Sequence, residues 1–364
     1  MYLSTKECPA SVRILLERIN EAASREIRIM EVCGTHTVAI FRHGVRSLLP
    51  TNITLLSGPG CPVCVTAQRE IDTFIAAASL DNVIIATFGD LLKVPGTGTS
   101  LQRERALGRQ VKIVYSVLDA LELAKKHSDK EIIFLGVGFE TTTPTIAAAI
   151  MEAKRTGMGN FSILSAHKLV PPALDALMAS SDANIHGFLC PGHVSVVIGS
   201  DVYIKLVEQY NIPCVVAGFE PTDILEAIAM LTSQVARGDA RVENQYRRAV
   251  TAKGNEKAMQ TMFKVFEPCD AEWRGIGVIP LSGLKIKEEF LLFDAIKKFE
   301  ISVSDSKPPA GCLCGDILKG IKTPSECPLY KRQCTPIDPV GPCMVSTEGT
   351  CAAYYKYQDS DTRI

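Results

Sequence analysis

The cysteines near the end of the chain carry the strongest chemical signal in the sequence. Six of the 13 cysteines lie between residues 312 and 351, in a segment that is also rich in proline. The segment has few long apolar runs, so a bound metal centre would supply stability that burial alone does not. A [4Fe–4S] cluster needs four thiolates, and so does a Cys₄ zinc site, so the spacing leaves both open. The candidate ligands are Cys312, Cys314, Cys327, Cys334, Cys343 and Cys351.

Two earlier cysteine motifs each follow directly after an apolar run. Cys61 and Cys64 form a Cys-x-x-Cys pair at a predicted helix start, where the helix dipole favours the thiolate. The pair could exchange electrons as dithiol and disulfide, or provide half of a metal site. Cys33 and His36 share one turn in Cys-Gly-Thr-His, and both are suitable ligands for iron. His36 could instead donate a proton or a hydrogen bond, and both residues could be purely structural.

Other polar side chains also stand at predicted strand ends. They are Glu140, His167 and His193, and Thr141 would open the helix after Glu140. A lone histidine is more often structural than a ligand, and threonines at a helix start often act as caps. The four remaining cysteines are predicted to be structural: Cys8, Cys190, Cys214 and Cys269.

Short apolar runs that alternate with helical patterns must position these residues. The first set of runs begins near residues 27, 54, 83 and 111, and the second near 131, 161, 186 and 213. Strands that alternate with helices form parallel sheets, whose functional loops lie at the carboxyl ends of the strands. The pattern therefore predicts an α/β protein whose chemistry is collected at the edges of its sheets.

The two sets of runs predict two similar parallel-sheet α/β domains of about four strands each. We place the first domain at residues 25–130 and the second at 131–236. Apolar spacing predicts one amphipathic helix over residues 10–24. Residues 1–24 together with 237–364 are expected to form a third, smaller domain that is mainly helical and carries the metal centre.

The composition argues against several classes of protein. Lys and Arg total 39 and Asp and Glu total 40, so the chain lacks the excess positive charge that binding to nucleic acid or to an anionic membrane requires. An odd number of cysteines in a long chain is a poor fit to a secreted disulfide scaffold, and the first residues form no signal-peptide core. No apolar window is unbroken enough to span a membrane. We therefore expect a cytoplasmic protein with reduced thiols.

Taken together, the motifs resemble those of the hydrogenase maturation factor HypD family. The matching pieces are CGTHT, SGPGCPVC, GFETTTPT, LCPGHVS and the tail from CLCGD to GTCAAYY, which span nearly the whole chain. The family's cluster-binding pattern is C-x₁₄-C-x₆-C-x₁₆-C, and the intervening counts here are 14, 6 and 16. The resemblance therefore implies that a [4Fe–4S] cluster is held by Cys312, Cys327, Cys334 and Cys351.

The resemblance also implies roles for the other motif residues. Cys314 and Cys343 match a redox pair beside the cluster, and Cys61 and Cys64 match a second redox pair. Cys33 matches the cysteine that holds iron, with His36 expected to orient or protonate groups near it. Further candidates are Thr35, Glu140, Thr141, His167 and His193.

The family assembles the Fe(CN)₂CO group of [NiFe]-hydrogenases in a complex with the small chaperone HypC, while HypE delivers cyanide. The resemblance thus implies a scaffold that holds a transient Fe(CN)₂CO iron, with thiol redox activity, as a monomer within a hetero-complex. Release of cyanide from a protein thiocyanate requires two electrons, which dithiol pairs can supply. Two alternatives stay open: a thiol–disulfide oxidoreductase of the ferredoxin-dependent type, and a zinc-stabilised adaptor without redox chemistry.

Overall fold

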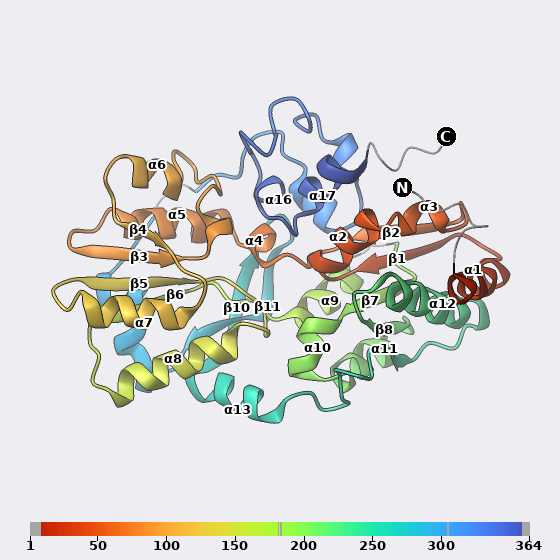
Figure 1. The fold of residues 1–364 in the computed structure, drawn as a ribbon, viewed down its shortest axis with the longest axis horizontal. Coiled ribbons are helices and arrows are strands. Elements are labelled where there is room, and N and C mark those ends of the chain that lie inside the picture. The colour runs from red at the N-terminus through yellow and green to blue at the C-terminus, as the bar shows by residue number, and fades with distance from the viewer. Residues whose placement is uncertain (1–8, 181, 183, 304–305, 359–364) are drawn as a thin grey trace.

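The computed structural model describes residues 9–358 except 181, 183, 304 and 305, and Cys8 therefore lies outside the described residues. Two α/β lobes lie side by side, and the cysteine-rich end of the chain sits over the junction between them (Figure 1). The predicted α/β class with parallel sheets is confirmed.

The first lobe is built on a five-stranded parallel sheet with the order β2-β1-β7-β8-β9. Strand β1 pairs with β2 on one side and with β7 on the other, so the β1–β7 pairing joins strands that are far apart in sequence. The strand bounds are β1 Ile27–Glu31, β2 Ile53–Ser57, β7 Gly187–Pro191, β8 Cys214–Ala217 and β9 Val242–Asn244.

The second lobe is built on a four-stranded parallel sheet with the order β4-β3-β5-β6. Strand β3 is buried along its whole length, as expected for a parallel strand covered by helices on both faces. The bounds are β3 Val83–Thr87, β4 Val111–Ile113, β5 Glu131–Gly136 and β6 Phe161–Ser165.

The expectation that the strands fill the two sheets in chain order is wrong. Strands β1 and β2 pair with β7 and β8, whereas β3 and β4 pair with β5 and β6. The sets at 25–130 and 131–236 therefore do not each close a sheet of their own. Hydrophobic periodicity reports that a segment is a buried strand but not which strand lies beside it, because pairing depends on contacts between distant residues.

Helices cover both sheets, and their caps follow local rules, such as the Ser116 side chain that accepts the Leu118 amide. Those of the first lobe are α1 Ala10–Ala22, α2 Gly34–Arg42, α3 Val45–Leu48, α9 Val170–Ala179, α10 Gly192–Ile198, α11 Ile204–Tyr210 and α12 Pro221–Arg237. Those of the second lobe are α5 Gln68–Ala78, α6 Leu101–Ala106, α7 Val117–Lys126, α8 Thr143–Arg155 and α13 Glu256–Val265. The predicted amphipathic helix is confirmed as α1, and it packs on α12 of the first lobe.

An antiparallel hairpin, which the expected helical pattern for residues 237–364 does not include, lies between the lobes (Figure 1). It consists of β10, Phe266–Trp273, and β11, Gly277–Ile286. Gly275 sits in the turn with φ +71°, a conformation that a residue without a Cβ adopts easily. After the hairpin, the chain forms a 3₁₀ segment, Glu288–Phe293, and the short helix α14, Ala295–Phe299.

The cysteine-rich tail has only short helices. These are α15 Cys314–Leu318, α16 Pro342–Val345 and α17 Thr350–Tyr357. Its small apolar cluster combines tail residues such as Cys327, Tyr330 and Cys334 with Phe41 of α2. The tail is therefore anchored on the first lobe, and Phe41 and Tyr354 meet edge to face with ring centroids 4.5 Å apart.

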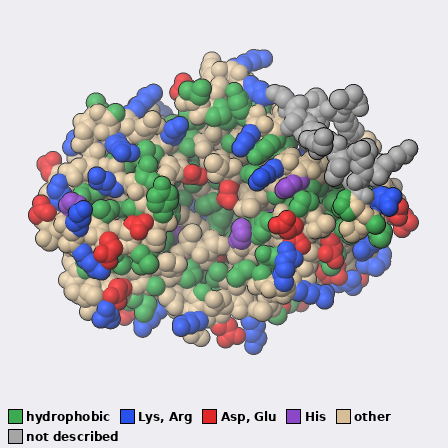
Figure 2. Space-filling view, in the orientation of Figure 1, with side chains coloured by type: hydrophobic (Ala, Val, Ile, Leu, Met, Phe, Trp, Pro, Cys, Tyr) green, Lys and Arg blue, Asp and Glu red, His purple; other side chains and the backbone are tan. Residues whose placement is uncertain are grey.

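The surface carries mixed charge. Figure 2 shows Lys and Arg side chains interspersed with Asp and Glu over the visible face. In the described part of the chain, none of the helices is long and apolar enough to cross a membrane.

Candidate thiol and metal site

All six tail cysteines border one cavity, which we call the cysteine cavity. The rest of its lining is mostly apolar, with Ile317, Leu329 and Met344 among its walls. Gly341 passes so close that a Cβ there would lie 2.9 Å from the Cys312 sulfur. The cysteines of this cavity are Cys312, Cys314, Cys327, Cys334, Cys343 and Cys351.

Burial controls the protonation of the outer thiols of the cysteine cavity. Burial raises the pKa of Cys312 to about 12, and the neighbouring cysteines raise it further. The pKa of Cys351 is raised for the same reasons. In residues 9–358, apart from the gaps noted above, no three His, Cys, Asp or Glu side chains are arranged to hold a single metal ion.

Cys314 and Cys343 form a close pair inside the cavity. Their sulfurs are 3.0 Å apart and both side chains are buried. The hydrogen bond between them lowers the pKa of Cys314 and raises that of Cys343, and the charge of Arg274 acts in the same direction on Cys314. Cys314 is therefore the member of the pair that more readily becomes a thiolate.

A second cysteine pair lies next to the first across a helix contact. Cys61 and Cys64 are joined by a disulfide bond, and Cys64 lies on α4, Pro62–Val65. Helix α4 packs against α16, which carries Cys343. All four sulfur-bearing side chains belong to one buried cluster. The two pairs are thus brought together from positions about 250 residues apart in sequence, at the place where Figure 1 shows α4 beneath α16.

The Cys61 loop in turn touches the loop that carries Cys33. Strands β1 and β2 are parallel neighbours, so both loops emerge at the same carboxyl edge. The Gly34 amide donates to the Gly60 carbonyl over 3.1 Å. A Cβ on Gly60 would lie 2.3 Å from the Cys33 nitrogen, so only glycine permits this approach.

Cys33 also meets the tail through its neighbours in sequence. The Thr35 hydroxyl donates to a Glu348 carboxylate oxygen over 2.6 Å, and Gly34 packs directly on the Glu348 backbone. Burial raises the pKa of Cys33 to about 11, and the charge of Glu348 contributes to the rise. The tail therefore completes the surroundings of Cys33.

Two histidines share one aromatic ring at this edge. His36 and His193 both stack on Phe219, with ring centroids 4.7 and 3.9 Å away. Nε2 of His36 donates to the Gly218 carbonyl over 2.9 Å, and burial lowers the pKa of His36 to about 4. His36 is therefore neutral with its proton on Nε2, and its Nδ1 makes no hydrogen bond with any described residue.

Glu140 and His167 belong to the other sheet, where they are deeply buried. Glu140 follows β5 and accepts the Val170 amide at the start of α9, and burial raises its pKa to about 7. Nδ1 of His167 lies 2.9 Å from the Ser165 hydroxyl, and burial lowers the pKa of His167 to about 3. Thr141 is exposed.

Three residues around the cysteines carried no signal in the sequence. Glu348, Phe219 and Arg274 are ordinary residues in their local contexts, and only the tertiary contacts bring them to the thiols. A motif search finds residues that are close in sequence, whereas these three reach the site from separate segments.

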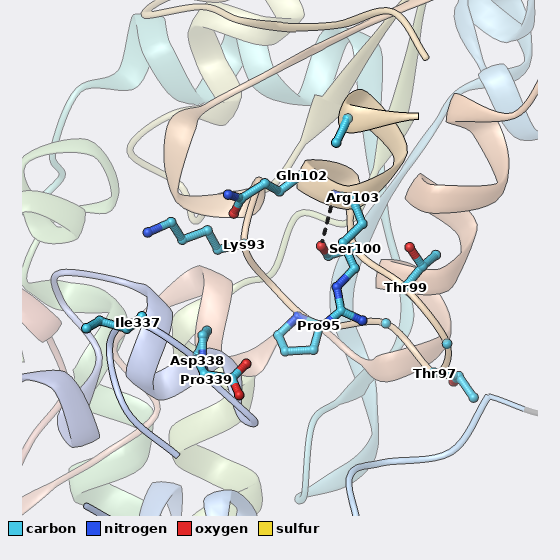
Figure 3. Close-up of a pocket in the computed structure, with 13 residues that line it drawn as sticks. Lys93, Pro95, Thr97, Thr99, Ser100, Gln102, Arg103, Ile337, Asp338 and Pro339 are labelled. Carbon is cyan, nitrogen blue, oxygen red and sulfur yellow. Dashed lines mark hydrogen bonds between the residues drawn. The ribbon is translucent and has the colours of Figure 1, made fainter. Parts of the chain in front are cut away.

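A larger cavity of about 470 Å³ lies apart from the thiols, between the loop before α6 and the tail. Lys93 and Arg103 border it from the second lobe, and Ile337 and Asp338 border it from the tail (Figure 3). Ser100 accepts the Arg103 amide at the start of α6 over 3.3 Å. No residue that the sequence analysis singled out lines this cavity.

The comparisons with known proteins agree with the motif pattern. Residues 10–358 match the family model HypD, described as the hydrogenase formation hypA family. The chain is 46% identical over 357 residues to the hydrogenase maturation factor HypD of Azotobacter vinelandii, covering 96% of this chain and 94% of that protein. It is 42% identical over 371 residues to HypD of Escherichia coli, covering 99% of both.

An archaeal relative is equally similar. The chain is 44% identical over 351 residues to a putative hydrogenase expression/formation protein of Methanocaldococcus jannaschii, covering 96% of this chain and 98% of that protein. A parallel α/β protein with a cysteine-rich tail is thus the class that the fold defines. The chain belongs to the HypD family.

Proposed function

We propose that this protein is a hydrogenase maturation factor, and that it assembles the Fe(CN)₂CO group of [NiFe]-hydrogenases on Cys33 with thiol redox chemistry. The observation that carries the proposal is a series of contacts between the elements that carry the thiols. It runs from the cysteine cavity through Cys314 and Cys343 to the α4 pair and then to Cys33. The matching relatives are named for hydrogenase maturation or formation.

The cysteine cavity suits an iron–sulfur cluster in the chemistry of its donors. Six thiols around one mostly apolar cavity provide soft ligands, and four of the six cysteines are buried. We assign Cys312, Cys327, Cys334 and Cys351 as the ligands of a [4Fe–4S] cluster, following the family spacing. Such a cluster supplies electrons one at a time when it is bound.

The α4 pair would perform the two-electron step. A dithiol at Cys61 and Cys64 reacts with a protein thiocyanate to give a disulfide, a free thiol on the donor and hydrogen cyanide, which balances two protons and two electrons. The α4 disulfide in the structure corresponds to the oxidised state that this step would leave. The contact between α4 and α16 supports regeneration of the dithiol by exchange with Cys314 and Cys343, which would become oxidised in turn.

Cys33 would hold the iron cargo, and His36 would orient groups near the iron. A thiolate is a soft ligand for iron, and the metal compensates for the burial that raises the pKa of Cys33 to about 11. The free Nδ1 of neutral His36 is an acceptor, so His36 orients a neighbouring donor instead of delivering its own proton. A cysteine of the chaperone HypC would complete the iron site, and HypE would supply the cyanide.

The test is anaerobic purification of the protein with its co-purifying partners, followed by infrared spectroscopy and iron analysis. Bands from CN and CO stretches in wild-type protein, lost in Cys33→Ser, are the expected result. A Cys33→Ser protein that retained HypC and the full set of bands would overturn the role of Cys33. The matched control is Cys269→Ser, which changes a half-buried cysteine on β10 outside this series of contacts.

A second candidate is a free-standing thiol–disulfide oxidoreductase of the ferredoxin-dependent type. The disulfide at α4 beside the thiol pair on α15 and α16 favours it. Turnover of small disulfides at full rate without HypC, in protein that lacks the infrared bands, would support this function over the first. A colourless protein with zinc in place of iron would favour the adaptor instead, since zinc absorbs no visible light.

A further inference from the structure

A small cavity, which we call the arginine cavity, lies on the outer side of Cys314. It has a volume of about 210 Å³, and its walls include Pro309, Pro342 and the paired backbones of Gly275 and Gly315. Cys312 and Cys314 border both this cavity and the cysteine cavity, whereas Cys343, the partner of Cys314, borders only the cysteine cavity of the two. The arginine cavity thus gives one sulfur of the pair a separate route toward solvent.

Arg274 lines this cavity and is a buried cation with an incomplete set of partners. Only 6% of the residue is exposed. Its Nε donates to the Thr66 carbonyl over 2.8 Å and its Nη1 donates to Gln68 Oε1 over 2.7 Å. Its Nη2 has no hydrogen-bond partner within the described residues.

No carboxylate of the described residues forms an ion pair with Arg274. Asp316 borders the same cavity, but its carboxylate lies 3.8 Å from the Lys319 ammonium. Burial of a guanidinium without an anion is costly, which favours a bound anion beside it. Thr66 and Gln68 follow the Cys61–Cys64 motif in sequence, so they hold the guanidinium rigidly against the redox centre.

We propose that the arginine cavity binds the carboxylate of a small anionic thiol, whose sulfur then attacks Cys314. This role rests on the proposed function, in which the thiol pairs need a reductant after each cyanide is released. The volume leaves room for a molecule of a few heavy atoms but not for a folded protein domain. The sulfur of Cys314 and the charge of Arg274 together select a ligand that combines a thiol with an anionic group.

The exchange is balanced in atoms and electrons. The external thiolate attacks the Cys314 sulfur of an oxidised Cys314–Cys343 pair, the disulfide bond breaks, and Cys343 leaves as a thiolate. A second external thiolate attacks its counterpart in the mixed disulfide and releases Cys314. Two external thiols are thereby oxidised to one disulfide, and the protein pair gains two electrons and the two protons.

The test compares an anionic and a neutral alkylating reagent on the reduced, cluster-containing protein. Iodoacetate and iodoacetamide transfer groups of similar size, and peptide mass spectrometry gives the rate of each at Cys314. For each thiol, the rate with iodoacetate is divided by the rate with iodoacetamide. This ratio is expected to be about tenfold higher at Cys314 than for the free thiol N-acetylcysteine, because the charge of Arg274 attracts the anionic reagent. Arg274→Gln is expected to return the ratio to that of the free thiol, and Lys125→Gln, which removes an exposed cation on α7 outside the lining, is expected to leave it unchanged.

Competition with a second anion on the wild-type protein tests the anion site even if Arg274→Gln fails to fold. Propionate should slow alkylation of Cys314 by iodoacetate, whereas its neutral analogue propionamide should not, because only propionate carries the anionic group that Arg274 binds. Equal effects of propionate and propionamide, or a wild-type ratio equal to that of the free thiol, overturn the anion site. If the anion site fails this test but the CN and CO infrared bands are normal, the proposed function stands. If the rate ratio is raised in protein that lacks the infrared bands, the anion site stands and the proposed function is overturned.

Discussion

The carboxyl edges of the two parallel sheets differ in what covers them. At the five-stranded sheet, the loops after β1 and β2 bring Cys33 and Cys61 together, and the cysteine-rich tail packs on them through Glu348. At the four-stranded sheet, β11 closes over the loop after β6, where the Ser165 hydroxyl donates to the Leu284 carbonyl. The Leu169 amide likewise donates to the Ser282 carbonyl.

On the proposed function, this difference separates a reactive edge from a structural one. Both edges carry polar residues directly after strands, so the local pattern is the same. His167 is buried, and its ring packs edge to face on Phe266 of β10 with the ring centroids 5.4 Å apart. His193, in contrast, is exposed and stacks on Phe219, the ring that also contacts His36. We therefore expect substitutions at the first edge to change maturation and substitutions at the second to change stability.

The largest expected effect is the loss of maturation in Cys33→Ser. A serine hydroxyl is a hard, weakly acidic ligand, so the soft iron site should not form. Hydrogenase activity should disappear in cells that carry only this variant, while the free energy of unfolding changes by less than about 1 kcal/mol. Glu140→Gln, at the other edge, should keep maturation, and equal losses in both variants would contradict the division between the edges.

The next effect is a pH dependence of stability that comes from Glu140. Its pKa in the folded protein is raised from 4.5 to about 7. Below pH 4.5 both states are protonated and ionisation has no effect, whereas between pH 4.5 and 7 the unfolded state loses the proton first. The free energy of unfolding should therefore fall with rising pH across this window by roughly 3 kcal/mol through this group.

Glu140→Gln should remove that dependence, because the amide does not ionise and keeps an oxygen for the Val170 amide. Denaturant unfolding of both proteins from pH 4.5 to 7.5 measures the difference, which should grow with pH and level off above about 7. The control is Glu122→Gln, whose side chain is 70% exposed. A constant difference between wild type and Glu140→Gln would refute the assignment.

A smaller effect is expected where the tail meets the first lobe. A Cβ on Gly34 would lie 2.5 Å from the Glu348 carbonyl oxygen and 2.6 Å from its Cβ, so Gly34→Val must push the tail away. Destabilisation by about 1–3 kcal/mol is expected from such overpacking, together with reduced maturation. Gly98→Val is the matched control, because a Cβ there meets nothing within 4 Å. Similar unfolding curves for the two variants would show that the contact is not tight.

The smallest effect is expected for Thr35→Val. It removes the hydrogen bond from the Thr35 hydroxyl to Glu348 while it keeps the shape of the side chain. The half-exposed position should limit the loss to about 1 kcal/mol. Thr261→Val removes a hydrogen bond from the Thr261 hydroxyl to the Lys257 carbonyl within helix α13, and it serves as the reference in the same unfolding assay. A loss no larger than in the reference would remove Thr35 from the anchoring of the tail.

The sequence by itself determined the cysteine motifs and the class of fold. The grouping of the tail cysteines, the Cys61-x-x-Cys64 pair and the Cys33 turn were readable because chemical motifs are local in sequence. The alternation of strands and helices gave the parallel α/β class, and apolar spacing gave helix α1. These features depend on residues within a few positions of one another.

Only the tertiary structure decided which strands are neighbours and which side chains surround the thiols. The exchange of strands between the sheets, the hairpin over His167 and the contact of Glu348 with the Cys33 loop all join distant segments. Arg274 beside Cys314 is the same kind of feature. Such contacts follow from burial and packing over the whole chain, where many pairings satisfy the same local pattern and only one fills the core.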